Sequence, residues 1–357
     1  MSIWKDAKTS LHTLEGYYLI DLDAPFTWRD CVMGNANVAC GLEEGCRFPL
    51  ECDTSFCLEA YSYINPKCPP LNITAKYGCK ICAVTPLNPI SKSCKLSKLT
   101  TDLMRFLGTD GHNPSTSVKY PKDAFGMKFV ISCAPSSLLR SLPKDASGVA
   151  AFSWSNLAFP RQLQTLVHDM EDKFALCLPS SSKAPGVTFL GDGPFYFTSF
   201  PNIDLRSILS YTPMLRKHIP LPSLKTGSVK LSTVIPYTKL RSDIFKAFVS
   251  SFSIATKRIP RLKSVQPFSL CLKSSAVGSV EKGFRVPKID LETEGGKNWT
   301  ISGDNSMKRV GNGTACLAFV DGGLRMKDAI VNGTFQLENN FLFLDLGNQK
   351  LGLALLY

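Results

Sequence analysis

The chain has 357 residues, of which 44% are hydrophobic and 20% are charged, and its net charge is +12. A single hydrophobic core stops growing at about 250–300 residues, so this length predicts two lobes. The apolar content excludes a disordered chain, and no run of about 18 apolar residues is present to form a membrane-spanning helix. We therefore expect a protein of two globular lobes without a membrane partner.

Short apolar runs bounded by turn-forming residues predict a strand-rich fold. In chain order, strands are expected at 17–22, 128–132, 186–190, 228–234 and 341–346. Gly347-Asn348 follows the last of them and predicts a hairpin. Apolar residues recur at helical spacing in 161–170 and in 242–256, where Ser242 is a candidate N-cap.

Nine of the 13 cysteines are crowded into the first hundred residues, and the other four are scattered later in the chain. The pair Cys79 and Cys82 has the spacing of zinc ligands, but no second pair completes a tetrahedral site, so we expect no metal. Disulfides formed in an oxidising compartment explain the pattern better. The disulfide candidates are Cys31, Cys40, Cys46, Cys52, Cys57, Cys68, Cys79, Cys82, Cys94, Cys133, Cys271 and Cys316.

Four glycosylation sequons agree with passage through the secretory pathway, and they begin at Asn72, Asn298, Asn312 and Asn332. The first ten residues, MSIWKDAKTS, lack the apolar core of a signal peptide. We therefore expect a secreted, extracellular protein whose signal peptide is not contained in this sequence.

The positive charge is concentrated in one segment. Residues 193–273 hold 13 Lys or Arg but only two acidic residues, while the rest of the chain is nearly balanced. One interpretation is a solvated face that keeps the protein soluble, and another is a surface that attracts acidic partners. Nucleic acid is not expected, because the basic residues lack interleaved aromatic residues.

Motifs of common enzyme classes are absent. There is no Gly-x-Ser-x-Gly, no phosphate-binding glycine loop, no His-Glu-x-x-His and no dinucleotide fingerprint, so no cofactor is expected. His168 lies in the first predicted helix without a nucleophile motif nearby, and we interpret it as a surface residue.

One cluster near the N-terminus has a different character. Residues 17–31, YYLIDLDAPFTWRDC, form an apolar strand that runs into Asp21, followed by Trp28 and Cys31. This stretch resembles the first active-site strand of plant pepsin-like aspartic proteases, with Asp21 at the catalytic position. Further stretches resemble the xylanase-inhibitor, glucanase-inhibitor and basic 7S globulin branch of that family: GVAAFSWSNLAFPRQL (148–163), FALCLPSSSKAPGVTFLGDGPF (174–195), LSTVIPYTKL (231–240), FSLCL (268–272), ACLAFVDGG (315–323) and FQLENNFLFLDL (335–346).

The resemblance implies an all-β dominated, bilobal pepsin-like (acid protease) double β-barrel with a few short helices. The implied lobes are a cysteine-rich N-terminal one at 1–193 and a basic C-terminal one at 194–357. It also implies a disulfide between Cys271 and Cys316. Members of the branch continue into a cysteine-bearing tail that this chain lacks, which makes Cys177 the candidate free thiol.

Active members of the protease family need two carboxylates that share a proton, one from each lobe. Here the first triplet reads Asp21-Leu22-Asp23, and alignment on Pro236-Tyr237-Thr238 puts Ser232 at the second position. We therefore expect Asp21 and Asp23 to end a strand at a turn, and no catalytic residue to be present. The partial triplet at Asp53 and the corner at Asp321 are likewise interpreted as structural.

The resemblance favours a non-enzymatic binding protein that inhibits microbial glycoside hydrolases such as xylanase, xyloglucanase or endoglucanase in plant defence. Its partner would be a secreted hydrolase, whose paired carboxylates can accept hydrogen bonds from an inserted basic side chain. A storage or small-peptide-binding role like that of basic 7S globulin is the first alternative. Residual aspartic protease activity is the second.

Overall fold

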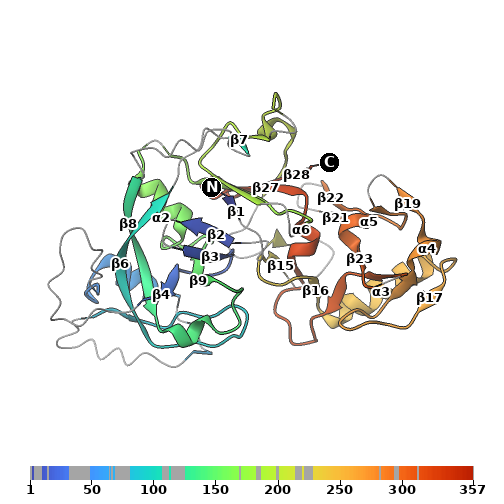
Figure 1. Ribbon diagram of the computed structural model, residues 1–357, viewed down its shortest axis with the longest axis horizontal. Coiled ribbons are helices and arrows are strands. Elements are labelled where there is room, and N and C mark those ends of the chain that lie inside the picture. Colours follow the sequence, from blue (N-terminus) through green and yellow to red (C-terminus); the bar gives the residue numbers. More distant parts are fainter. Residues whose placement is uncertain are drawn as a thin grey trace. The chain divides into compact units, whose positions relative to one another are not determined.

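The computed structural model describes residues 2–3, 10–13, 16–31, 49–63, 65, 67–68, 81–106, 112–113, 125–168, 170–181, 186–197, 201–213, 219–220, 228–280, 283–292, 297–311 and 313–356. Strands dominate these residues and the helices are short, as expected from the sequence (Figure 1). None of the helices in this part of the chain combines the length and apolarity needed to cross a membrane.

The chain forms two compact units. The first comprises Met1–Ile208 with Phe343–Asn348, and the second comprises Leu209–Leu342 with Gln349–Tyr357. The boundary expected from the sequence lies earlier, after residue 193. Each unit is built around its own sheet and its own hydrophobic core, so each is described separately.

The first unit is built on a seven-stranded sheet with the order β2-β3-β9-β4-β8-β6-β5. The helix α2 (Phe159–Leu166) packs on β8, where the rings of Phe129 and Phe159 stack with centroids 4.9 Å apart. The strands are β2 (Ser10–Thr13), β3 (Gly16–Asp21), β4 (Trp28–Asp30), β5 (Ala83–Val84), β6 (Ser97–Phe106), β8 (Phe125–Ala134) and β9 (Ala146–Ala151).

A second sheet of the first unit has the order β1-β11-β10-β27, and β7 pairs in parallel with β12. From Phe343 onward β27 belongs to this unit. Asp345 accepts the amide hydrogen of Asn348 and so holds the turn expected there. These elements are β1 (Ser2–Ile3), β7 (His112–Asn113), β10 (Lys173–Cys177), β11 (Gly186–Leu190), β12 (Tyr196–Phe197), β27 (Asn340–Asp345), α1 (Ser55–Tyr61), η1 (Ser136–Leu139) and η2 (Leu205–Ile208).

The second unit contains a five-stranded sheet, β14-β15-β26-β16-β25, and a four-stranded sheet, β17-β18-β24-β23. Three antiparallel pairs complete its strands: β19 with β20, β21 with β22, and β13 with β28. The strands are β13 (Ser210–Pro213), β14 (Ile219–Pro220), β15 (Ser228–Leu231), β16 (Thr238–Leu240), β17 (Arg261–Leu262), β18 (Cys271–Lys273), β19 (Ser279–Val280), β20 (Gly283–Phe284), β21 (Ile289–Glu292), β22 (Asn298–Ile301), β23 (Met307–Arg309), β24 (Thr314–Leu317), β25 (Phe319–Asp321), β26 (Ile330–Asn332) and β28 (Lys350–Leu355).

The helices of the second unit are α3 (Ser242–Ala255), α4 (Ser274–Val277), α5 (Gly303–Ser306) and α6 (Thr334–Leu337). The prediction of a helix in 242–256 is confirmed, but Ser242 is its first helical residue and not its N-cap, which is Arg241. The Ser242 hydroxyl instead donates a hydrogen bond to the Asp321 carboxylate at the end of β25. Tertiary contact with β25 therefore decides the role of this serine.

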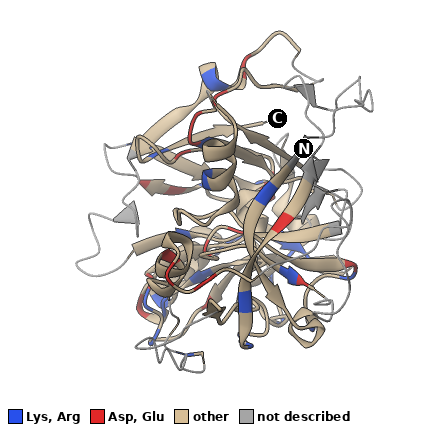
Figure 2. Ribbon diagram, turned by 90° about the vertical axis from the view of Figure 1, so that its left-hand side faces the viewer, with Lys and Arg blue, Asp and Glu red and all other residues tan. Residues whose placement is uncertain are grey.

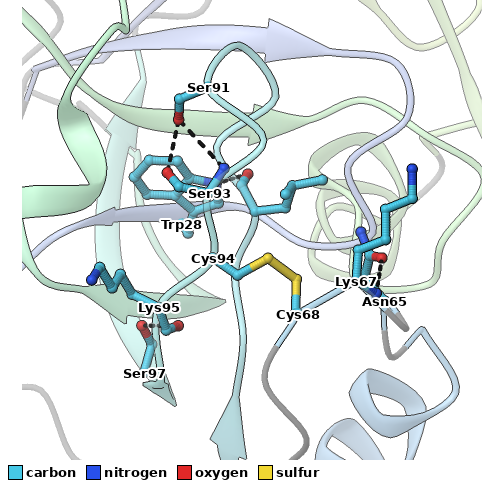
Figure 3. Close-up of a disulfide and its surroundings, with 10 residues drawn as sticks. Trp28, Asn65, Lys67, Cys68, Ser91, Ser93, Cys94, Lys95 and Ser97 are labelled. Atoms are coloured by element: carbon cyan, nitrogen blue, oxygen red, sulfur yellow. Dashed lines mark hydrogen bonds between the residues drawn. A yellow bond between two sulfur atoms is a disulfide. The ribbon is translucent and has the colours of Figure 1, made fainter.

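Disulfides brace both units. The structure pairs Cys57 with Cys82, Cys68 with Cys94, and Cys271 with Cys316, the last directly opposite each other in β18 and β24. Figure 3 shows the Cys68–Cys94 bridge in the same view as Trp28, whose indole N–H donates to the Leu87 carbonyl over 3.2 Å. Cys52 is also disulfide-bonded. Cys40, Cys46 and Cys79 lie outside the described residues.

The expectation of disulfides at Cys31 and Cys133 is wrong, because both carry free thiols. Strand register gives the reason: β4 and β8 run in parallel with Cys133 opposite Arg29, so the two cysteines do not face each other. The Cys133 thiol instead donates to the Cys31 carbonyl over 3.5 Å. Cys177, the free thiol expected from the resemblance, also carries no disulfide.

Alkylation at pH 8 checks this assignment. Burial raises the pKa of the Cys133 thiol to about 11, and the nearby Asp30 carboxylate adds to the effect. Only about one Cys133 thiol in a thousand is then ionised at that pH, whereas Cys31 is half-buried. Peptide mass mapping of native protein treated with iodoacetamide should show Cys133 modified at least ~10-fold more slowly than Cys31, with the difference abolished by unfolding. Recovery of a Cys31–Cys133 disulfide peptide would contradict the structure.

Candidate functional site

Asp21 is the last residue of β3 and lies opposite Ala151 of the parallel strand β9. The three residues before it are buried, which makes β3 an interior strand. The Asp21 carbonyl accepts the amide hydrogen of Phe152 over 2.9 Å, and its carboxylate accepts that of Asp23 over 2.9 Å. Asp21 is only 7% exposed, whereas Asp23 is exposed. The two acids therefore lie where a buried strand ends in a turn, as expected.

Ser232 follows β15 in the second unit and is 8% exposed. Its amide hydrogen bonds to the Asn332 carbonyl over 2.8 Å. Its hydroxyl oxygen accepts the amide hydrogens of Val234 at 3.2 Å and Ile235 at 3.3 Å. A side-chain oxygen that accepts backbone N–H groups two and three residues ahead closes a tight turn. The turn at Ser232 is therefore of the same kind as the turn at Asp21.

Strand pairing shows that the two turns are equivalent. In the first unit, β3 runs parallel to β9, β9 antiparallel to β4, and β4 parallel to β8. In the second unit, β15, β26, β16 and β25 repeat these three relations in the same order. We call each set a strand crossing. Leu231 pairs with Asn332 as Ile20 pairs with Ala150, so Ser232 occupies the place of Asp21.

Each crossing is closed by a threonine that our sequence interpretation did not single out as a site residue. Thr27 accepts the amide hydrogen of Ala151 over 3.1 Å, and Thr238 accepts that of Gly333 over 3.2 Å. Both threonines are at most 1% exposed. The signal in the sequence was a repeated Pro-aromatic-Thr, which reads Pro25-Phe-Thr27 and Pro236-Tyr-Thr238.

The second crossing is joined to a buried network of amide side chains. The Gln336 side-chain oxygen accepts hydrogen bonds from the Thr238 amide at 2.9 Å and from its hydroxyl at 2.8 Å. The Gln336 side-chain nitrogen donates to the carbonyls of Asn305 and Ala318. A fully buried amide with all of its hydrogen bonds made fixes the position of the strands around it. The network therefore holds β16 against α6.

The sequons have different outcomes. The prediction of glycosylation at Asn332 is wrong, because this residue lies in β26 and is 0% exposed. Its side-chain oxygen accepts a hydrogen bond from the Thr238 hydroxyl over 3.4 Å. A glycan on this nitrogen has no room in the folded core. Asn298 is exposed on β22 and stays a candidate. Asn72 and Asn312 lie outside the described residues.

The remaining acidic residues considered in the sequence analysis lie in turns or at strand ends, and the histidine considered there is exposed. Asp53 lies in a turn just before α1, whose N-cap is Thr54. Asp321 ends β25, where hydrogen bonds from the Ser242 hydroxyl and the Gly323 amide lower the pKa of its carboxyl group. His168 is exposed, as expected. Among the described residues, no group of three or more His, Cys, Asp or Glu side chains is arranged to hold a metal ion.

With this geometry established, comparison with known proteins identifies the family. The family model described as xylanase inhibitor N-terminal matches residues 12–192, and the model described as xylanase inhibitor C-terminal matches residues 210–354. The chain belongs to the xylanase-inhibitor family. Members of this family are generally non-catalytic relatives of pepsin-like proteases.

The relatives carry several names. A protein from Oryza sativa subsp. japonica named chitinase CLP is 35% identical, and the match covers 99% of this chain and 87% of that protein. Gamma conglutin 1 from Prunus dulcis is 31% identical over 99% of this chain and 85% of that protein. The crystal structure of edgp matches with a TM-score of 0.80 and 26% identity, over 99% of this chain and 94% of that one. The crystal structure of basic 7S globulin from soybean matches with a TM-score of 0.74 and 25% identity, over 99% of this chain and 93% of that one.

Substitution of Thr27 by valine tests the strand crossing. Valine keeps the shape of the side chain but leaves the buried Ala151 N–H without its acceptor, so the free energy of unfolding should fall by about 1–3 kcal/mol. The matched control is Thr165→Val on α2, whose exposed hydroxyl donates to the Gln162 carbonyl and whose loss should cost about 0.5 kcal/mol or less. Denaturant unfolding followed by tryptophan fluorescence measures both. Equal losses in the two variants would show that the buried threonine has no special role.

Proposed function

We propose that this protein is a secreted, catalytically inactive binding protein that inhibits microbial glycoside hydrolases. The observation that carries the proposal is the serine at position 232, in the place equivalent to Asp21. Peptide hydrolysis by this fold needs two carboxylates, because one must be ionised to activate water while the other is protonated to polarise the carbonyl group. A serine hydroxyl cannot take either part. The surviving Asp21 therefore has no acidic counterpart in the second crossing.

The neighbouring residues support the same conclusion. Leu22 and Asp23 replace the hydroxyl-bearing residue and the glycine of the resembled triplet. The Asp21 carboxylate accepts a hydrogen bond from the turn that follows it, so it has a structural use without catalysis. Retention of an aspartate at this position is thus compatible with an inactive protein.

The distribution of charge supports binding of an acidic protein. Several basic groups of the first unit lie in ion pairs, for example Lys173 with Asp192 at 2.8 Å and Arg29 with Asp102 at 3.3 Å. Figure 2 shows Lys and Arg interspersed with Asp and Glu along the ribbon. The excess charge of residues 193–273 has no such balance in the sequence. A positive field of this kind raises the rate of association with acidic enzymes.

Two other functions follow from the names of relatives. Relatives named basic 7S globulin and gamma conglutin favour a storage or peptide-binding role, which indifference to hydrolases and capture of a small cysteine-rich peptide would support. The rice relative is named as a chitinase, an enzyme class whose usual mechanism needs positioned acidic groups. The chitinase activity enters the experiment below as a separate readout.

Purified protein should slow at least one enzyme in a panel of secreted microbial xylanases, xyloglucanases and endoglucanases at low salt, in proportion to its concentration. The protein unfolded and reduced beforehand is the control, because its disulfides and crossings are lost. The same preparation should release no sugar from chitin and no peptides from denatured protein at acid pH. Pepstatin-sensitive cleavage that disappears in Asp21→Asn, or hydrolysis of chitin, would refute the inactive assignment. Failure to inhibit any enzyme of the panel would refute the inhibitor assignment.

A further inference from the structure

The second unit carries a long stretch without negative charge. Residues 244–280 contain no Asp or Glu but six Lys or Arg. Four of these, Lys257, Arg258, Arg261 and Lys263, are close in sequence and all are exposed. None of the four forms an ion pair with a carboxylate in the part of the chain that the structure describes. Their charge is therefore not neutralised locally.

Apolar side chains are exposed among these cations. Ile254, at the end of α3, is 66% exposed, Leu262 of β17 is 39% exposed and Val265 is 41% exposed. Single exposed apolar residues are ordinary, but these three alternate with four exposed cations within twelve residues of the chain, which gives this stretch a mixed character. We call this set the α3–β17 surface: Ile254, Lys257, Arg258, Arg261, Leu262, Lys263 and Val265.

The surface is held in place by hydrogen bonds and a disulfide. The Arg261 guanidinium donates to the Ser253 carbonyl at 2.6 Å and to the Thr256 hydroxyl at 3.1 Å, which fastens β17 to the end of α3 (Figure 1). On its other side β17 pairs with β18, whose Cys271 is bridged to Cys316 of β24. A pre-ordered surface loses less conformational entropy when a partner binds than a loop would.

We propose that the α3–β17 surface is a docking site for an acidic protein. This inference rests on the proposed function, since it places the acidic hydrolase on a defined part of the second unit. Charge complementarity sets the sign of the partner, and exposed cations on a fixed surface act mainly on the association rate. The three aliphatic side chains then lose water on contact and slow dissociation.

The apolar residues favour a protein over a polyanion. Proteins that bind single-stranded nucleic acid by stacking use aromatic side chains next to basic ones. The exposed aromatic residues among those described are Tyr17, Phe56, Tyr63 and Tyr211, and none of them belongs to this stretch. Aliphatic side chains among cations suit a protein surface in which carboxylates surround an apolar centre.

Charge reversal with a matched control tests the proposal. The surface variant is Lys257→Glu/Arg258→Glu/Lys263→Glu, and the control is Lys95→Glu/Lys128→Glu/Lys144→Glu, which changes the net charge equally through exposed lysines of the first unit. The binding partner is the acidic enzyme of the panel that wild-type protein inhibits best. Association and dissociation rates are measured by surface plasmon resonance at about 20 mM and about 200 mM salt, because screening distinguishes charge steering.

The surface variant should associate at least ~10-fold more slowly than wild type at low salt and show little salt dependence, and the control no more than ~2-fold more slowly. A second variant, Ile254→Ser/Leu262→Ser, should dissociate at least ~5-fold faster with an unchanged association rate. Circular dichroism and the thermal midpoint of each variant confirm folding.

Equal effects of the two charge-reversed variants would overturn the proposal, because net charge alone would then explain the rates. Unchanged inhibition by the surface variant would overturn it while leaving the proposed function intact. Retention of wild type but not of the surface variant on immobilised polygalacturonate, with enzyme binding unaffected, would assign the surface to a polyanion and overturn it as well. If wild type binds no enzyme of the panel, the proposed function and the docking site both fail.

Discussion

Each strand crossing contains one buried hydrogen bond from a backbone amide to the hydroxyl of a threonine, Thr27 just before β4 and Thr238 at the start of β16. Thr27 lies next to β9 and Thr238 next to β26. Each of these two strands pairs with a parallel strand on one side and with an antiparallel strand on the other, so the regular ladder cannot satisfy every N–H group there. The threonine supplies the missing acceptor. Because the bond fixes the register of the crossing, it also fixes the turn that carries Asp21 or Ser232.

The two crossings show that the turn after the strand can be closed by either an aspartate or a serine. The side chain that closes the turn needs only an oxygen atom able to accept backbone amide hydrogens, and serine provides this as well as aspartate does. The structural requirement at Ser232 is therefore weaker than the chemical requirement of a protease. A substitution that removes a carboxylate from this position leaves the strand pairing intact.

Charge is organised differently in the two units, and this difference has a functional meaning. Some basic side chains of the first unit pair with carboxylates, as Lys173 and Arg206 do. The α3–β17 surface of the second unit keeps its cations hydrated and unpaired on rigid elements. Under the proposed function, affinity and selectivity for a partner would come from such surfaces by complementarity alone.

The sequence alone determined the strand-rich fold, the family and the helix α3, because apolar periodicity and local motifs are readable along the chain. Only the tertiary structure decided the outcomes that depend on distant partners. Cys31 and Cys133 keep free thiols, and burial in β26 removes Asn332 as a glycosylation site. Likewise, Ser242 was predicted to cap a helix, but its hydroxyl donates a hydrogen bond to Asp321. Pairing between strands far apart in sequence sets these properties, and no local pattern records it.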